Sequence, residues 1–424
     1  MSLLIQNAVL VNADGRRSAE VLIENGRISR IGAKLSAPSA QTLDAKGAYL
    51  LPGLIDLHCH LRDPGFEYKE DIVTGTRAAA AGGFTSVLCM ANTHPVNDCG
   101  AVTRYILQKA EAAGFCAVYP IGAVSKGLEG KEIAEMGDMK EAGAVAFSDD
   151  GQPIWNSKLM ELALLYSGRF GAYVISHPED KSLSDGGAMN RGVTATLLGL
   201  PGISRAAEES MIARDLILAE ENRAHVHIAH ISTAGCVEMI RQAKARGVRV
   251  TCETTPHYLC LDDTACEGYD TAARVSPPLR TVADQEALIE GLLDGTVDAI
   301  ATDHAPHHLD DKRVEFIQAA TGISGFETAF SACYTRLVVS GRMTLEQLVD
   351  RMSRTPAAVA GLSGGTIEEG APADLVLVDA GEWTVRAARF CSKGKNTPFD
   401  GKTLCGRILK TIHNGTLVYE RGAE

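Results

Sequence analysis

The sequence lacks the features that would assign the protein to a membrane or to a nucleic acid. No uninterrupted apolar run approaches the roughly 18 residues that a helix needs to span a bilayer. The first residues of the chain alternate apolar and polar side chains without a basic stretch and a long apolar core, so they predict a strand rather than a signal peptide. The formal net charge is −12, whereas nucleic acids and anionic membranes bind basic surfaces. We therefore expect neither partner.

The cysteine pattern also lacks the spacing of a disulfide framework or a zinc finger. The 11 cysteines are odd in number and scattered, and no two have the spacing C-x-x-C. Reduced thiols of this kind predict a cytoplasmic protein. The 45% of hydrophobic and 22% of charged residues are typical of an ordinary globular chain. With 424 residues, a large barrel plus a smaller unit is the expected organisation.

The central part of the chain alternates between strand-like and helix-like stretches. Apolar, β-branched runs end near His60, Met90, Ile121, Phe147, Ser176, His230, Cys252 and Thr302. Helical patterns separate most of them, at Lys69–Ala81, Val102–Ala113, Ile203–Glu221, Gly235–Ala245 and Ala283–Leu293. This alternation predicts an α/β fold, a (β/α)₈ TIM barrel that forms the catalytic domain over residues 51–365. A doubly wound open sheet is the alternative, but no G-x-G-x-x-G motif follows the first strand.

Both ends of the chain resemble short strands instead. Residues 3–11 and 374–378 have strand character, and residues 21–29 and 412–418 predict hairpins. Each hairpin contains an Asn-Gly pair, which is typical of a type I′ turn. Neither end is long enough for a good core of its own. We therefore predict one small composite β-domain, a β-sandwich built from residues 1–50 plus 366–424.

Polar residues follow the predicted barrel strands at the end where barrel active sites lie. His58 and His60 are two residues apart, so both side chains lie on one face of the first strand. Further histidines and acidic or amide residues follow later strands: Asn92, Asp149, Asp150, His177, His230, Asp303 and His307. Imidazole and carboxylate groups converging on one rim predict a metal centre.

Two metal ions would need a bridging carboxylate, for which Asp150 is the best candidate and Asp149 the alternative. His58, His60 and Asp303 would then bind one ion, and His177 and His230 the other. A bridging water would be acidified towards hydroxide. Asp303 is placed to take its proton and to deliver it to a leaving nitrogen, which makes it the candidate catalytic residue.

Four motifs in these regions are distinctive: HCHLRDPG at 58–65 with EYKED at 67–71, MANT at 90–93, FSDDG at 147–151 and TDHAPH at 302–307. With them the chain resembles the dihydroorotase family, of the long bacterial type with an aspartate-bridged metal site, within the amidohydrolase superfamily. The resemblance covers essentially the whole chain and is most specific at the first and last motifs. The sequence departs from the family at Ala91 and Ser276, where proline and asparagine are usual. Many relatives have a carboxylated lysine as the metal bridge, in place of an aspartate.

The resemblance implies zinc-dependent, reversible cyclisation of N-carbamoyl-L-aspartate to L-dihydroorotate plus water, a step of pyrimidine biosynthesis, with one or two Zn²⁺ ions per chain and two expected. It implies that Arg62 and Asn92 bind the substrate carboxylate. It also implies that His307 and the Thr321-Gly322 backbone contact the ring, with position 276 as a further ring-binding residue. Besides this small-molecule substrate, the expected partners are a second copy of the chain in a homo-oligomer (a dimer) and aspartate transcarbamoylase.

Two other functions compete with this interpretation. The first is another cyclic amidohydrolase, such as a hydantoinase, a dihydropyrimidinase or an allantoinase. The rings of those substrates lack the carboxylate, so such an enzyme has little use for Arg62, whose planar fork matches a carboxylate. The second is a non-catalytic dihydroorotase-like scaffold subunit, which would be expected to have lost ligands, whereas none of the six ligand positions is missing.

Other polar residues near the motifs are expected to have structural roles. His304 should point away from the site, and Cys59 should pack in the core. For His257, both a pocket-facing and a structural orientation stay open. Packing or surface positions are expected for His225 and His227. A solvated turn and helix start is expected for Glu67, Glu70 and Asp71.

Overall fold

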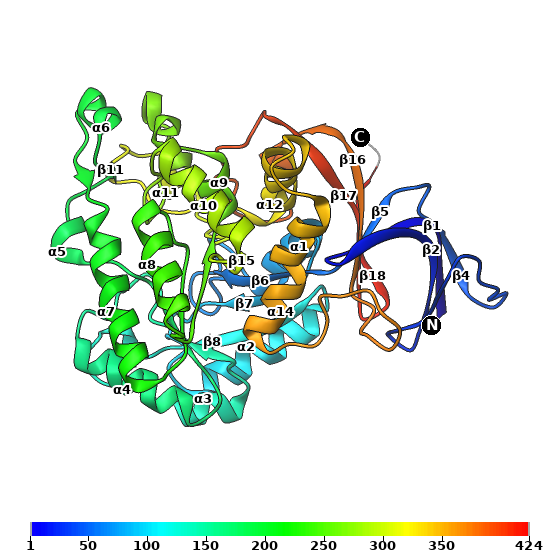
Figure 1. Cartoon of the computed structure of the whole chain (residues 1–424), viewed down its shortest axis with the longest axis horizontal. Coiled ribbons are helices and arrows are strands. Elements are labelled where there is room, and N and C mark those ends of the chain that lie inside the picture. The colour runs from blue at the N-terminus through cyan, green and yellow to red at the C-terminus, as the bar shows by residue number, and fades with distance from the viewer. Residues whose placement is uncertain (1, 423–424) are drawn as a thin grey trace.

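A computed structural model, which describes residues 2–422, contains a parallel barrel beside a second sheet (Figure 1). The barrel strands are Leu54–Cys59 (β6), Phe84–Cys89 (β7), Ala117–Gly122 (β8), Ala146–Phe147 (β9), Val174–Ser176 (β10), Val226–Ile228 (β13), Val250–Thr254 (β14) and Ala299–Ile300 (β15). They pair in parallel in this order. An isolated parallel bridge between Cys59 and His304 connects the end of the first strand to the segment that follows the last one. The predicted (β/α)₈ fold is confirmed.

Helices surround the barrel, and local sequence signals set their ends. Asp71 caps α1 by accepting a hydrogen bond from the backbone N–H of Thr74, and Gly114 ends α2 in the left-handed conformation with φ 69°. The α-helices are Ile72–Ala81 (α1), Gly100–Ala113 (α2), Met136–Ala142 (α3), Ser157–Gly168 (α4), Lys181–Ser184 (α5), Val193–Leu198 (α6), Ala206–Asn222 (α7), Ala234–Ala245 (α8), Pro256–Cys260 (α9), Val282–Asp294 (α10), Leu309–Lys312 (α11), Phe326–Cys333 (α12), Leu345–Val349 (α13) and Thr355–Ala360 (α14).

Shorter elements complete the barrel unit. A two-stranded pair, Met189–Asn190 (β11) and Gly202–Ile203 (β12), flanks α6 in an insertion. Short 3₁₀ segments lie at Lys126–Leu128, Asp263–Tyr269 (kinked at Glu267 and Gly268) and Thr271–Ala273, and π-helical turns at Tyr334–Val339 and Asp350–Arg354. A further 3₁₀ turn, Ala387–Arg389, lies in the C-terminal part of the chain. Within residues 2–422, no helix is both long and apolar enough to cross a membrane.

The second sheet combines both ends of the chain, as predicted. Its strands are Ser2–Asn12 (β1), Gly15–Glu24 (β2), Arg27–Gly32 (β3), Gln41–Asp44 (β4), Tyr49–Pro52 (β5), Leu375–Thr384 (β16), Thr403–His413 (β17) and Thr416–Glu420 (β18). The antiparallel pairing of β5 with β16 joins the two ends. Both Asn-Gly pairs have positive φ, 52° and 76° at Asn25-Gly26 and 47° and 75° at Asn414-Gly415, as a type I′ turn requires. Buried apolar residues of both ends form one cluster, including Ile5, Val21 and Leu375.

One segment of the C-terminal part leaves this sheet and lies against the barrel. It connects β16 to β17, and Phe390 and Phe399 in it belong to the same buried cluster as Phe326 of α12. The predicted division at residues 50 and 365 stays a prediction, and residues 1, 423 and 424 of its ranges lie outside the described part of the chain.

Candidate active site

The six predicted metal ligands meet at the carboxyl end of the barrel strands. His58 lies in β6, His60 directly follows it, and the other four follow β9, β10, β13 and β15. All six side chains are buried: His58, His60, Asp150, His177, His230 and Asp303. Because parallel strands end at one rim, residues distant in sequence converge there.

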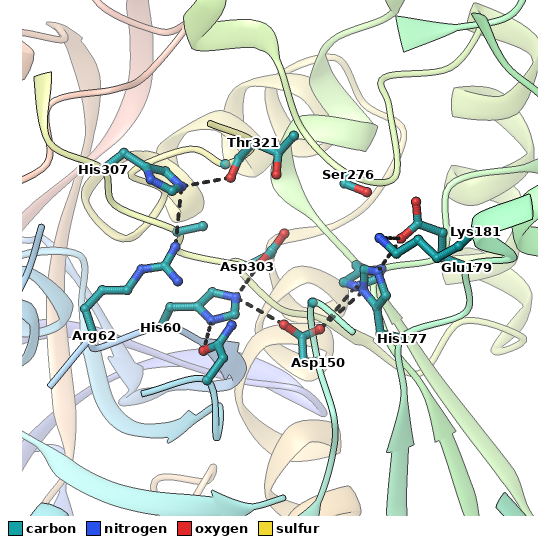
Figure 2. A pocket seen from close by; sticks show the side chains of 15 residues that line it. His60, Arg62, Asp150, His177, Glu179, Lys181, Ser276, Asp303, His307 and Thr321 are labelled. Atoms are coloured by element: carbon teal, nitrogen blue, oxygen red, sulfur yellow. Dashed lines mark hydrogen bonds and ion pairs between the residues drawn. The ribbon is translucent and has the colours of Figure 1, made fainter. Parts of the chain in front are cut away.

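Asp150 lies at the centre of this group (Figure 2). Its Oδ1 is 3.3 Å from His58 Nε2, 3.4 Å from His177 Nδ1 and 3.5 Å from His230 Nε2. Its Oδ2 is 3.4 Å from His60 Nε2. Two sets of three ligand atoms therefore share this carboxylate, and within each set all atoms lie within 4.8 Å of one another. This is the arrangement that a bridging ligand requires.

Asp149, the alternative bridge, bonds to a neighbouring loop instead of the ligand cluster. Its Oδ1 accepts hydrogen bonds from the backbone N–H groups of Val124, at 2.8 Å, and Ser125, at 2.9 Å. Its Oδ2 accepts a bond from the Ser125 hydroxyl. Asp149 therefore holds the loop at residues 124–125, whereas Asp150 belongs to the ligand cluster.

Asp303 lies beside the set that contains the first two histidines. Its Oδ1 is 3.2 Å from His60 Nε2 and 3.6 Å from His58 Nε2. Burial alone would raise the pKa of Asp303, but the hydrogen bond from His60 and the charge on His58 hold it well below its ordinary value. The group is therefore a carboxylate.

The donor set fits divalent metal ions. His58 Nε2, His230 Nδ1 and Asp150 Oδ1 are buried without a hydrogen-bond partner in the described residues, which is costly unless a further group binds them. Burial alone would lower the pKa of His177, but Asp150 and Glu179 raise it to about 9. The cluster therefore attracts positive charge, and neutral imidazole and carboxylate are the ligands that zinc and its neighbours prefer.

A pocket of about 220 Å³ opens beside this cluster. Figure 2 shows Arg62 and His307 on one side of it, Glu179 and Lys181 on the opposite side, and Asp150 between them. All six predicted substrate-binding residues line the pocket: Arg62, Asn92, Ser276, His307, Thr321 and Gly322.

Arg62 reaches the pocket from beyond the end of the first barrel strand. The strand ends at Cys59, and Arg62 has φ 62°, so strand alternation does not continue to this residue. Its guanidinium contacts Pro306 O at 3.4 Å and His307 Nε2 at 3.5 Å. Asp63 instead pairs with Lys109. Among residues 2–422 no carboxylate lies within ion-pair distance of Arg62, although the guanidinium is charged and half-buried.

His307 and Gly322 form the rim of the pocket next to Arg62. The neutral ring of His307 donates from Nε2 to Thr321 O at 2.9 Å. Burial and the nearby charges of Arg62 and Lys69 lower the pKa of His307 to about 2, so the ring stays neutral. Gly322 has φ 141°, and a Cβ there would lie 2.6 Å from Ala305 Cβ, so only glycine fits.

Comparison with known proteins agrees with this geometry. A family model described as "Dihydro-orotase-like" matches residues 47–235, and one described as "Amidohydrolase family" matches residues 218–419. The chain is 54% identical to a dihydroorotase of Acetivibrio thermocellus over 94% of both chains. It is 52% identical to a dihydroorotase of Ruminiclostridium cellulolyticum over 99% of both chains.

The chain belongs to the dihydroorotase family. It is therefore a cyclic amide hydrolase of the amidohydrolase group.

Solved structures of related hydrolases share the fold. An L-hydantoinase (dihydropyrimidinase) from Arthrobacter aurescens superposes with a TM-score of 0.90 and 28% identity, covering 99% of this chain and 96% of that one. A dihydropyrimidinase from Brevibacillus agri gives a TM-score of 0.83 and 26% identity, covering 99% and 95%. Two of the competing functions considered from the sequence, hydantoinase and dihydropyrimidinase, are thus the names of structural neighbours of this dihydroorotase-family chain.

Sequence patterns did not identify Glu253, which orients the predicted metal ligand His58 by bonding to its second ring nitrogen. His58 Nδ1 donates to Glu253 Oε1 at 2.8 Å, and His227 Nε2 lies 3.2 Å from Glu253 Oε2. Burial would raise the pKa of Glu253, but the two histidines lower it to about 2. This ionised carboxylate fixes the His58 tautomer with Nε2 towards Asp150, a support that metal-binding histidines commonly have. A charged residue within the apolar strand β14 could have drawn attention to Glu253, but no sequence pattern indicates that it pairs with His58.

Two other supports come from residues at the pocket. Asn92 Oδ1 accepts from His60 Nδ1 at 2.9 Å, so the side chain predicted to bind substrate also holds a ligand. Glu179 Oε2 is 3.3 Å from His177 Nε2 and 2.6 Å from Lys181 Nζ. Glu179 and Lys181 were not predicted as site residues.

The expectation of a solvated position was wrong for Glu70. It is fully buried because its carboxylate accepts hydrogen bonds from Ser392 Oγ and the backbone of Lys393, which approach from the C-terminal segment. His304 points away from the pocket and stacks on Phe326 with ring centroids 4.0 Å apart, as expected.

Cys59, Asp71 and three further histidines were expected to have structural roles or to stay open between two orientations. Cys59 is buried in the core, and Asp71 starts α1. His257 is buried and does not line the pocket. His225 and His227 bond to Thr251 and lie outside the ligand cluster, as predicted.

Proposed function

We propose that this chain catalyses the reversible, zinc-dependent cyclisation of N-carbamoyl-L-aspartate to L-dihydroorotate plus water. The observation that carries the substrate assignment is Arg62, a charged guanidinium that lines the pocket beside the ligand cluster and has no carboxylate partner within residues 2–422. A carboxylate on the substrate would supply that partner through two parallel hydrogen bonds. Relatives that are 54% and 52% identical carry the name dihydroorotase.

The remaining pocket residues would orient the ring. Asn92 uses its Oδ1 for His60, which leaves its Nδ2 to donate to the substrate carboxylate beside Arg62. His307 and the Thr321-Gly322 backbone would contact the ring from the rim beside Arg62. Ser276 lines the same pocket and can offer a hydroxyl in place of the amide usual at this position.

Asp303 would move the proton. In the hydrolytic direction a water oxygen forms a bond to the ring amide carbon, and the C–N bond breaks. Asp303 Oδ1 faces His60, whereas its Oδ2 has no hydrogen bond from residues 2–422 and can accept the proton of the water. Asp303 then delivers that proton to the leaving nitrogen. When bound at the two ligand sets, zinc ions would acidify the water and polarise the carbonyl.

The proposal includes two zinc ions per chain, because two ligand sets share Asp150. It also places the enzyme in the cytoplasm, in keeping with 11 cysteines that are all free thiols. A homodimer and an association with aspartate transcarbamoylase stay predictions, which sedimentation analysis and co-purification with that enzyme can test.

Arg62→Met should raise the KM for L-dihydroorotate by at least about 30-fold, because a buried charge pair loses one partner. Any weak hydrolysis of uncharged dihydrouracil should change little. The measurement is steady-state turnover of both rings by the same preparation. It tests the substrate assignment separately from the metal chemistry.

Arg62→Lys is the matched control. It should restore binding only in part, because a point charge cannot reproduce two parallel hydrogen bonds. Equal losses on both rings would instead make Arg62 a structural residue, and the choice of L-dihydroorotate over a hydantoin-like ring would then lose its structural support.

A further inference from the structure

Residues 390–397, which we call the rim strap, link the C-terminal part of the chain to the barrel. The carboxyl groups of Glu70, which is buried, and Glu327, which is half-buried, hold one end of the strap. Glu327 Oε1 accepts from the backbone N–H of Cys391 at 2.7 Å, and Glu70 Oε2 accepts from that of Lys393 at 3.2 Å. Hydrogen bonds from backbone N–H groups to carboxyl oxygens hold that part of the backbone in place. The strap is thus anchored independently of the pocket.

Asn396, near the other end of the strap, joins the two loops that form the ring-contacting rim. Its Oδ1 accepts from the backbone N–H of His307 at 3.0 Å and from Ser324 Oγ at 2.9 Å. Its Nδ2 donates to Gly322 O at 2.9 Å and to Ala305 O at 3.3 Å. The side chain is buried, and both of its polar atoms are satisfied by backbone or hydroxyl groups of the rim.

The strap also packs closely against Pro306, whose carbonyl contacts Arg62. A Cβ added to Gly394 would lie 2.6 Å from Pro306 Cβ and 2.8 Å from Ser324 Oγ. Glycine is therefore required for the strap to lie on this loop. The carbonyl of Pro306 in turn lies 3.4 Å from Arg62 Nε. A shift of the strap would therefore move the Pro306 carbonyl beside Arg62 together with the loops that carry His307 and Gly322.

We propose that Asn396 is a positioning residue for substrate binding, which sets the spacing between His307 and Gly322 across the rim. This inference rests on the proposed function, in which those two residues contact the ring. Only an amide offers a donor to two carbonyls and an acceptor to two donors at this place. A segment that the sequence assigns to the small β-domain thereby shapes the active site of the barrel.

Asn396→Ala should raise the KM for L-dihydroorotate about tenfold or more, while kcat stays within about threefold of the wild type. The metal content should be unchanged, because Asn396 contacts no ligand of the cluster. Hydrogen exchange of the backbone amides of residues 305–307 and 321–324 should accelerate, since the two loops lose their common partner.

Asn12→Ala is the matched control. Asn12 also bridges distant segments with its amide, donating to Ile367 O at 3.0 Å and accepting from Ile367 N–H at 2.8 Å, but it lies in the composite sheet. Its replacement should lower the melting temperature without changing KM. Gly394→Ala provides a second route, and a KM rise of the same direction is expected because its methyl group pushes the strap from Pro306.

An unchanged KM in both Asn396→Ala and Gly394→Ala would overturn the proposal, as would an equal rise in Asn12→Ala. If Asn396→Ala does not fold, Gly394→Ala decides alone. Wild-type protein that fails to turn over L-dihydroorotate would instead overturn the proposed function itself, so the two failures are distinguishable.

Discussion

Asp150→Ala is expected to remove bound metal and activity together. Its carboxylate is the only group shared by the two ligand sets among the described residues, so its loss weakens both. The fall in activity should exceed the roughly 10–100-fold effect of losing a group that merely supports a metal ligand. Elemental analysis of the purified variant, together with turnover of L-dihydroorotate, measures both effects in one preparation.

Asp149→Ala is the control at the adjacent position. It should keep its metal and most of its activity, because Asp149 holds the backbone of Val124 and Ser125 rather than the cluster. It should lose stability instead, by about 1–3 kcal/mol, since buried N–H groups are left without an acceptor. If the two variants exchanged these behaviours, Asp149 would be the bridge and the local register would be off by one residue.

Asp303→Asn is expected to lower kcat by about 10²–10⁴-fold, the usual contribution of general acid–base catalysis, with KM roughly retained. Asparagine keeps the size of the side chain and one ligating oxygen, but it cannot accept the proton of the water. Steady-state kinetics separate the two parameters, and metal analysis checks that the loss is chemical. A variant with near-normal kcat would remove Asp303 from the role of base.

The ligand cluster was predictable because barrel strands end at one rim. The sequence shows where each apolar run ends. The polar residue that follows then lies at the carboxyl rim of the barrel, whatever residues surround it in the sequence. That reasoning brought together His58, Asp150 and Asp303, and the structure places an oxygen of each aspartate within 4 Å of His58 Nε2.

The residues that sequence reasoning missed depend on contacts outside that rule. Glu253 supports His58 from within a strand, 195 residues away in sequence, and no local pattern connects them. Glu70 resembles a solvated helix start until the strap covers it, 323 residues further along the chain. Arg62 lies in the pocket with a left-handed backbone, which no pattern in the sequence indicates. Long-range packing decided each of these cases.

The most direct test is turnover of L-dihydroorotate, followed by the ultraviolet absorbance of its amide, before chelation, after chelation and after zinc is restored. The two ligand sets, the buried atoms without partners and the role of Asp303 predict activity that disappears with the metal and returns with zinc. Full turnover by thoroughly metal-free protein would contradict the proposed mechanism. An absence of turnover in zinc-loaded protein would contradict the substrate assignment.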